Sequence, residues 1–144
     1  MAPIKVLFVC VHNSARSQMA EAYLNHFGAG RFAAESAGLE PGILNPRVVQ
    51  VMKEDSIDIS GKQTKSVSEM LKRGGLYDLV VTVCDETSAE KCPIFPGASK
   101  RLHWGFADPS SLTGTEDEKL DRTRAIRDEI KSKVKAWIES LDLA

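Results

Sequence analysis

Apolar and polar residues along the chain follow two periods in turn, and this pattern predicts strands that alternate with helices. Residues 4–10 form an apolar run rich in β-branched side chains, which is typical of a parallel strand buried on both faces. Over residues 17–27 the apolar side chains recur every three or four positions, which predicts a helix that stops at Gly28. A shorter run over residues 32–37 predicts a second strand, closed by Gly38.

The rest of the chain continues this alternation. The expected ranges are a helix from Pro46, a weaker helix over 65–72, strands over 77–84 and 100–104, and a last helix over about 118–141. The last helix carries an apolar stripe that we expect to pack on the sheet, made of Ile126, Ile130, Val134, Trp137, Ile138 and Leu141. Residues 105–117 are rich in Ser, Thr, Asp and Gly, which predicts an irregular loop. The alternation indicates one α/β domain over residues 1–144, with a four-stranded parallel sheet and helices on both faces.

Composition narrows the class of protein. The 144 residues carry a net charge of −1, which gives no reason to expect a nucleic acid or an acidic membrane surface as partner. No apolar run approaches the length of a membrane span and the N-terminus lacks a signal-peptide layout, so we expect a cytoplasmic protein. Cys10, Cys84 and Cys92 are an odd number of thiols, which favours reactive cysteines over a disulfide framework. The three histidines show no paired zinc-ligand spacing near Cys84 and Cys92, so we expect neither a metal nor a cofactor.

The candidate chemistry lies where the first strand meets the first helix, at Cys10-x₅-Arg16-Ser17. Backbone N–H groups of such a loop and the positive end of the helix dipole form an anion site, and Arg16 adds a bidentate donor for an oxyanion. This setting favours the thiolate form of Cys10, which makes it a nucleophile aimed at the bound anion. The alternative is a small apolar cysteine in the core. The expected oxyanion-binding residues are Val11, His12, Asn13, Ser14, Ala15, Arg16 and Ser17.

These motifs resemble the low molecular weight tyrosine phosphatases, over nearly the whole chain. The loop motif stands within the first dozen residues, and Asp108-Pro109 matches the late loop whose aspartate is the general acid in those enzymes. The resemblance implies the strand order 2-1-3-4 and the role of general acid for Asp108. The chain departs from the phosphatases at Ala15, where they usually carry a second cysteine, and at Ser110 and Ser111, where they usually carry tyrosines.

Within that superfamily the sequence is most similar to the thioredoxin-coupled arsenate reductases. The features that carry this likeness are Cys-Val-His-Asn-Ser-Ala-Arg-Ser-Gln at 10–18, the pair Cys84 and Cys92 before Pro93, and His103-Trp104-Gly105-Phe106. The resemblance implies arsenate as substrate, phosphate or sulfate as competing oxyanions, and thioredoxin as partner. Asn13 and Ser17 are expected to orient the loop and to bond the Cys10 sulfur, His12 to satisfy loop backbone groups, and His103 and Trp104 to pack under the Asp108 loop.

The strand order also places the second thiol. Neighbouring strands lie about 4.8 Å apart, so the strands ending in Cys10 and Cys84 bring these residues within the roughly 4.4–6.8 Å that a disulfide needs. Cys84 is then expected to attack the Cys10 sulfur, and Cys92 to attack Cys84 and pass the disulfide outward to thioredoxin. Residues 85–92 form either a loop or a short helix. A helix separates the two Cα atoms by roughly 12 Å, so it must unwind before Cys84 and Cys92 can join.

Some reductases of this branch bind potassium near the loop. Asn13, Glu21 and Ser36 match three of the potassium ligands, but the acidic fourth ligand expected near Lys65 and Ser66 is missing. We therefore expect no metal at this place and expect the positive charge of Lys65 to replace that of the potassium ion.

Two other functions remain open on the sequence. One is a phosphatase acting on phosphotyrosine or small aryl phosphates, and the other is a redox- or oxyanion-sensing module. Cys84 and Cys92 discriminate among these functions, because hydrolysis of a Cys10 adduct does not need them.

Overall fold

The computed structural model describes residues 3–13, 15–74, 76–83 and 98–142. Its strands are β1 (Ile4–Cys10), β2 (Phe32–Gly38), β3 (Tyr77–Thr82) and β4 (Ala98–His103). Its helices are α1 (Arg16–Phe27), α2 (Pro46–Glu54), α3 (Val67–Lys72), the short 3₁₀ helix η1 (Pro109–Ser111) and α4 (Glu116–Asp142).

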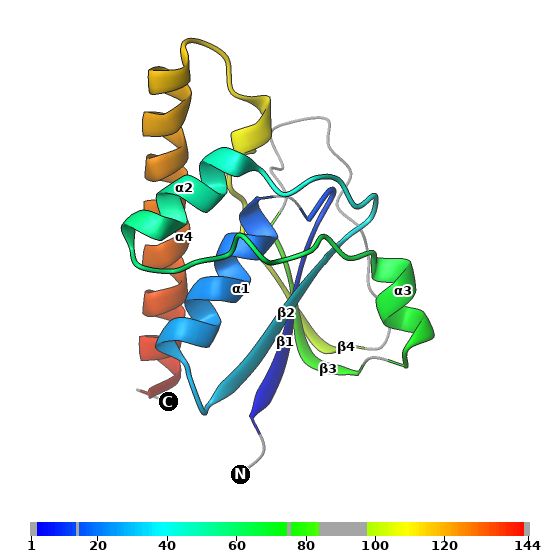
Figure 1. Cartoon of the computed structure of the whole chain (residues 1–144). Coiled ribbons are helices and arrows are strands. Elements are labelled where there is room, and N and C mark those ends of the chain that lie inside the picture. The colour runs from blue at the N-terminus through cyan, green and yellow to red at the C-terminus, as the bar shows by residue number, and fades with distance from the viewer. Residues whose placement is uncertain (1–2, 14, 75, 84–97, 143–144) are drawn as a thin grey trace.

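The strands form one parallel sheet in the order β2-β1-β3-β4, which confirms the predicted fold and strand order (Figure 1). From β1 the chain moves to β2 on one side, and it later returns to β3 on the other side of β1. In such a sheet the crevice for a ligand lies outside the carboxyl ends of the strands where the direction of winding reverses. That point is the end of β1, at Cys10.

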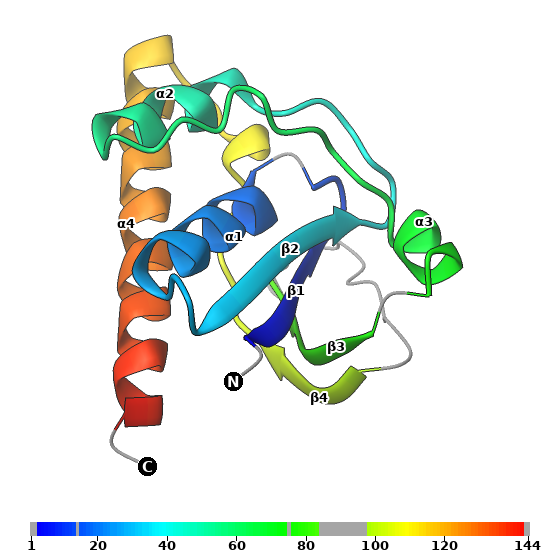
Figure 2. The ribbon, with the colours of Figure 1, turned by 60° about the horizontal axis from the view of Figure 1, so that its bottom comes forward.

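Helices cover both faces of the sheet, as predicted. Helices α1, α2 and α4 lie on one side and α3 lies on the other (Figures 1 and 2). The side chains of β1 divide between two cores because successive residues of a strand point to opposite faces. Val6 and Phe8 pack with α1 and α4, whereas Leu7 and Val9 pack with α3. All four are fully buried, so β1 is the strand on which both layers rest.

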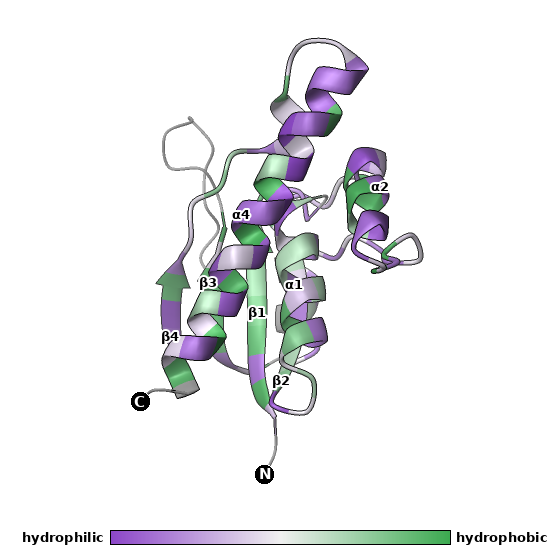
Figure 3. Ribbon diagram, turned by 90° about the vertical axis from the view of Figure 1, so that its left-hand side faces the viewer, coloured by the Kyte–Doolittle hydropathy of each residue, from purple (hydrophilic) through white to green (hydrophobic). Residues whose placement is uncertain are grey.

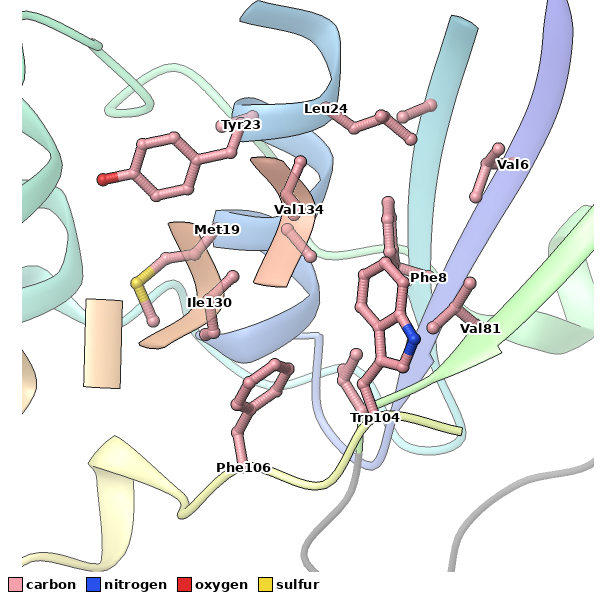
Figure 4. Close-up of a cluster of buried hydrophobic side chains, with 14 of the residues drawn as sticks. Val6, Phe8, Met19, Tyr23, Leu24, Val81, Trp104, Phe106, Ile130 and Val134 are labelled. Atoms are coloured by element: carbon pink, nitrogen blue, oxygen red, sulfur yellow. The ribbon is translucent and has the colours of Figure 1, made fainter. Parts of the chain in front are cut away.

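The larger core joins the sheet to α1 and α4 (Figure 4). Burying each large apolar side chain here contributes about 1.5–3 kcal/mol to folding. The predicted stripe of α4 is buried at four positions and Trp137 packs against the same core. Leu141 differs, with 38% of its surface exposed, because α4 continues beyond the core. Hydrophilic residues predominate on the side of α4 that Figure 3 turns to the viewer, whereas β1 behind it is hydrophobic.

Several boundaries differ from the predicted ones. Helix α4 begins two residues early because Thr115 and Glu118 form a capping box, in which Glu118 N–H donates to Thr115 Oγ1 (3.2 Å) and Thr115 N–H to Glu118 Oε1 (3.4 Å). Helix α3 begins only at Val67 because Ser66 caps it, accepting from Glu69 N–H at 3.0 Å. The predicted loop over 105–117 contains η1.

The other differences concern strands. Strand β4 begins at Ala98 rather than at residue 100, and β3 ends at Thr82 rather than at residue 84. Residues 84–97, which include the segment predicted as helix or loop, lie outside the described residues. Among the helices that the structure describes, none is long and apolar enough to cross a membrane.

Candidate active site

Cys10 ends β1 with only 2% of its surface exposed, and its sulfur meets polar groups of the following loop. The backbone N–H of Asn13 donates to Cys10 Sγ at 3.1 Å, and Ser17 Oγ lies 2.9 Å from the same sulfur. Donors at these distances stabilise a negative charge on sulfur. The contacts that the sequence predicts for Asn13 and Ser17 are therefore present.

The carbonyl groups of the loop are turned away from the predicted anion site, the cradle formed by residues 11–17. The carbonyls of Cys10, Val11 and His12 accept from the N–H groups of residues 39, 40 and 42, at 3.1, 2.8 and 2.9 Å. Because the N–H and C=O of a peptide unit point in opposite directions, this ladder turns the loop amides toward the other side. A line of inward amides is the geometry that an oxyanion requires.

The side chain of His12 lies outside this cradle. Its Nδ1 is 2.9 Å from the carbonyl oxygen of Glu40, and the residue is exposed. This contact agrees with the expectation that His12 satisfies loop backbone groups.

Asn13 organises the loop from its centre. Its φ of 54° lies in the left-handed region, which asparagine tolerates better than most residues. The side chain is fully buried; its Nδ2 donates to Ser17 Oγ (2.8 Å), and its Oδ1 accepts from Lys65 N–H (2.9 Å) and Gln18 Nε2 (3.2 Å). These bonds hold the backbone N–H of Asn13 on the Cys10 sulfur.

The start of α1 is chemically open to an anion. The capping residue Ala15 has no side-chain acceptor for the first N–H groups of the helix, and no acidic residue stands in the first turn. The positive end of the helix dipole therefore faces the loop without an internal counterion from the helix itself. Ser14, also predicted to bind the oxyanion, lies outside the described residues.

Arg16 joins the oxyanion loop to the Asp108 loop, 92 residues away in the chain. It is 3% exposed, its NH1 donates to the carbonyl of Phe106 at 3.1 Å, and its NH2 lies 3.8 Å from Asp108 Oδ2. The Asp108 carboxylate also accepts from Ser110 N–H (2.9 Å) and Ser111 Oγ (3.1 Å), which caps η1. The structure thus brings Cys10, Arg16 and Asp108 to one end of the sheet.

Aromatic packing fixes the segment that carries Asp108. Trp104 is buried and lies 5.8 Å, centroid to centroid, from both Phe8 and Trp137, and Phe106 is buried beside it (Figure 4). The packing predicted for Trp104 is confirmed. The same prediction is wrong for His103, which is exposed and whose Nδ1 lies 2.6 Å from Thr82 Oγ1. Its position at the end of β4 turns the ring outward.

The sequence did not indicate the roles that two further residues play in the site. A Cβ atom on Gly38 would lie 2.8 Å from Asn13 N and from Val11 O, so only glycine lets β2 approach the loop this closely. Gln18 donates to Asn13 and to the carbonyl of Gln63 (3.2 Å), tying the loop to a distant segment. The sequence indicated Gly38 only as the end of a strand and Gln18 only as part of the motif at 10–18.

The remaining predicted residues fall into two groups. Cys84 and Cys92 lie outside the described residues, so their position relative to Cys10 is untested. Glu21 and Ser36, matched to potassium ligands, do lie together: Ser36 Oγ donates to Glu21 Oε1 at 2.9 Å. Over the residues with assigned positions, no group of three or more His, Cys, Asp or Glu side chains is arranged to hold a metal ion.

Comparison with known proteins places the chain in a family. Residues 5–144 match the family described as low molecular weight phosphotyrosine protein phosphatase. The chain is 42% identical over 136 residues to the arsenate reductase of Bacillus subtilis strain 168, covering 94% of this chain and 95% of that protein.

Solved structures agree with this likeness. An arsenate reductase in the phosphate-binding state superposes with a TM-score of 0.77 at 31% identity, covering 95% of this chain and 98% of that one. The thioredoxin-dependent arsenate reductase of Corynebacterium glutamicum gives 0.67 at 28% identity, covering 99% of this chain and 64% of that one. The chain therefore belongs to the low molecular weight phosphotyrosine protein phosphatase family and, within it, to the arsenate reductases.

Proposed function

We propose that this protein reduces arsenate to arsenite, with thioredoxin as the source of electrons. The observation that carries the proposal is the likeness to arsenate reductases over 94% of the chain. The geometry around Cys10 supports it, because a sulfur that receives two polar contacts stands at the mouth of an amide-lined loop closed by Arg16. A thioredoxin-fed relay needs a compartment that keeps thiols reduced, and we assign the protein to the cytoplasm.

In the first step arsenate binds in the loop over residues 11–17 and Arg16 holds its oxygens. The Cys10 thiolate attacks arsenic and forms a sulfur–arsenic bond, while one oxygen leaves as water. Asp108, in its protonated form, gives the proton that this leaving oxygen needs. Its ties to Ser110, Ser111 and Arg16 hold the carboxyl group at the cradle.

In the second step the thiolate of Cys84 attacks the Cys10 sulfur. The sulfur–arsenic bond breaks and its electron pair stays on arsenic, so As(V) becomes As(III) and the two sulfurs become a disulfide. Cys92 then attacks Cys84, which returns Cys10 as a thiolate and leaves a Cys84–Cys92 disulfide. Thioredoxin reduces this disulfide through its own pair of thiols.

A weak phosphatase activity is favoured by the same cradle. Phosphate and arsenate have the same shape and charge, and the family model that matches residues 5–144 is that of phosphatases. Hydrolysis of a Cys10–phosphate adduct needs neither Cys84 nor Cys92. We therefore expect aryl phosphate hydrolysis to survive replacement of both residues by serine.

The decisive assay is NADPH consumption with thioredoxin and thioredoxin reductase present. Addition of arsenate is expected to start consumption, and Cys10→Ser is expected to abolish it. Consumption no faster than that of Cys10→Ser rules out the proposed reaction.

The relay has a separate test in Cys92→Ser. This variant is expected to release about one arsenite per enzyme and then to stop as a Cys10–Cys84 disulfide, because no third thiol frees Cys10. Arsenite release and peptide mapping of the stopped enzyme measure both outcomes. Steady turnover of Cys92→Ser with thioredoxin contradicts the relay.

A further inference from the structure

A buried carboxylate lies one turn beyond the oxyanion loop, and two lysines of a distant segment pair with its charge. Glu21, in the middle of α1, is 1% exposed. Its Oε2 lies 2.9 Å from Lys62 Nζ and its Oε1 lies 3.8 Å from Lys65 Nζ. An ionised carboxylate without such partners is costly at this depth.

The same segment is bonded to the oxyanion loop through its backbone. Lys65 N–H donates to Asn13 Oδ1 (2.9 Å), Lys65 O accepts from Gly38 N–H (2.8 Å), and Gln63 O accepts from Gln18 (3.2 Å). Asn13 in turn donates its own N–H to Cys10 Sγ. A continuous set of contacts thus runs from the lysine–Glu21 pairs to the nucleophile.

The residues present do not suit a potassium ion at this place. Both oxygens of Glu21 already face ammonium groups, and Asn13 Oδ1 already accepts two hydrogen bonds. A further cation here meets the repulsion of two fixed positive charges, and few oxygen lone pairs remain for it. The resemblance to potassium-binding reductases therefore stops at Asn13, Glu21 and Ser36.

We propose that Lys62 and Lys65 are positioning residues: their ammonium groups on Glu21 hold the 62–66 segment against Asn13, which keeps the Asn13 N–H on the Cys10 sulfur without any bound cation. Lys62 is the stronger partner, since its Nζ is the nearer to Glu21. Both lysines lie outside the oxyanion loop over residues 11–17, and each acts through Asn13. The proposal concerns the same site as the proposed reaction and rests only on the Cys10 loop.

The test measures Cys10 itself in the absence of arsenate. The rate of alkylation of Cys10 by iodoacetamide is followed against pH by mass analysis of its peptide, for the wild type, Lys62→Met, Lys65→Met and Lys62→Arg. Lys72→Met is the matched control, because Lys72 is an exposed lysine on α3, outside the 62–66 segment. All runs are made in choline chloride and repeated in potassium chloride at the same ionic strength.

Lys62→Met is expected to move the midpoint of this profile up by about one pH unit, which slows alkylation below the midpoint about tenfold. Lys65→Met is expected to move it less, and Lys62→Arg to restore most of the wild-type profile. The wild type is expected to be indifferent to potassium, whereas potassium partly restores Lys62→Met, since removal of the ammonium leaves room beside Glu21.

If Lys62→Met and Lys72→Met give the same pH profile, the positioning role of Lys62 is overturned. If potassium changes the profile of the wild type, the claim that the loop needs no bound cation is overturned. If Lys62→Met does not fold, Lys65→Met and Lys62→Arg decide the same question, and an unchanged profile in Lys65→Met then counts against it. Because no arsenate is used, these outcomes are separate from failure of the reductase assay.

Discussion

At the scale of single residues, Gly38 determines the shape of the loop by what it lacks. A Cβ atom there would lie 2.8 Å from Asn13 N, His12 C and Val11 O, which are backbone atoms that cannot turn aside. The carbonyl of Cys10 also pairs with the residue that follows Gly38, so any shift is passed along the ladder from 39 to 42. The shape of the cradle therefore depends on the position of β2 as much as on the residues of the loop itself.

We expect Gly38→Ala to lower the free energy of unfolding by about 1–3 kcal/mol and to weaken phosphate binding at least about tenfold, because the loop must move away from β2. Urea unfolding measures the first effect, and protection of Cys10 from alkylation by phosphate measures the second. Gly61→Ala is the control, since a Cβ atom at Gly61 meets nothing within 4 Å. Equal behaviour of the two variants contradicts the close approach.

Asp108 is the other residue whose role can be isolated. Asp108→Asn keeps an oxygen to accept from Ser110 N–H, so η1 should stay capped, but the amide cannot give a proton to a leaving oxygen. Turnover of arsenate is expected to fall about 10²–10⁴-fold, the usual contribution of acid–base catalysis. Phosphate protection of Cys10 is expected to stay near the wild-type value. Wild-type turnover in this variant removes Asp108 from the mechanism.

At the scale of elements, local patterns predicted most of the fold but only half of the site. The strand, loop and helix around Cys10 are contiguous, so hydrophobic period and motif spacing locate them together. Arg16 and Asp108 are 92 residues apart, and only the resemblance to a family indicated that they meet. The carbonyl of Phe106 and the close approach of Gly38 belong to the backbone and to the strand register, which residue types do not encode.

The start of α4 illustrates a signal that was present and unused. Thr115 and Glu118 have the spacing of a capping box, and their reciprocal bonds start the helix at Glu116. Hydrophobic period alone placed the start later, because the first turn of α4 is acidic and has no apolar stripe.

Replacing the cap tests this explanation. Thr115→Ala is expected to lower the free energy of unfolding by about 1 kcal/mol, because the first N–H groups of α4 lose their acceptor. Thr113→Ala, an exposed threonine two residues earlier, is expected to stay within about 0.5 kcal/mol of the wild type. Urea unfolding of both variants makes the comparison. A loss of equal size in Thr113→Ala would show that the cap is not the cause.

At the scale of the whole molecule, α4 is tied to α1 and α2 by polar contacts at the margin of the core. Arg127 NH1 donates to the carbonyl of Val51 and to Glu54 Oε1, both at 2.8 Å, and Arg124 pairs with Glu54 at 2.9 Å. Hydrogen bonds from Arg124 first, and from Arg127, hold the pKa of Glu54 below its usual value. These contacts pair α4 with a carboxylate of α2 that is held in its ionised form.

Asp55 is the carboxylate of this group that joins all three helices. Its Oδ2 accepts from Tyr23 of α1 (2.6 Å) and lies 3.1 Å from Lys131 Nζ of α4. Two hydrogen bonds lower the pKa of Asp55 below its ordinary value of 3.8: the bond from the Tyr23 hydroxyl has the larger effect and the bond from Lys131 the smaller. Burial and the same hydrogen bond raise the pKa of Tyr23, so Tyr23 stays a donor throughout the neutral and acidic range.

A group whose pKa is lower in the folded protein stabilises the fold above its unfolded pKa and loses that effect as the pH falls through the folded value. Asp55→Asn is therefore expected to be less stable than the wild type by about 1–2 kcal/mol at pH 7, a figure reduced for the partial exposure of the pair. The difference should shrink as the pH falls below 3.8. Urea unfolding from pH 7 to pH 2.5 measures it, with Glu139→Gln on the exposed side of α4 as control. A difference that stays constant with pH would show that Asp55 acts through shape and not through its charge.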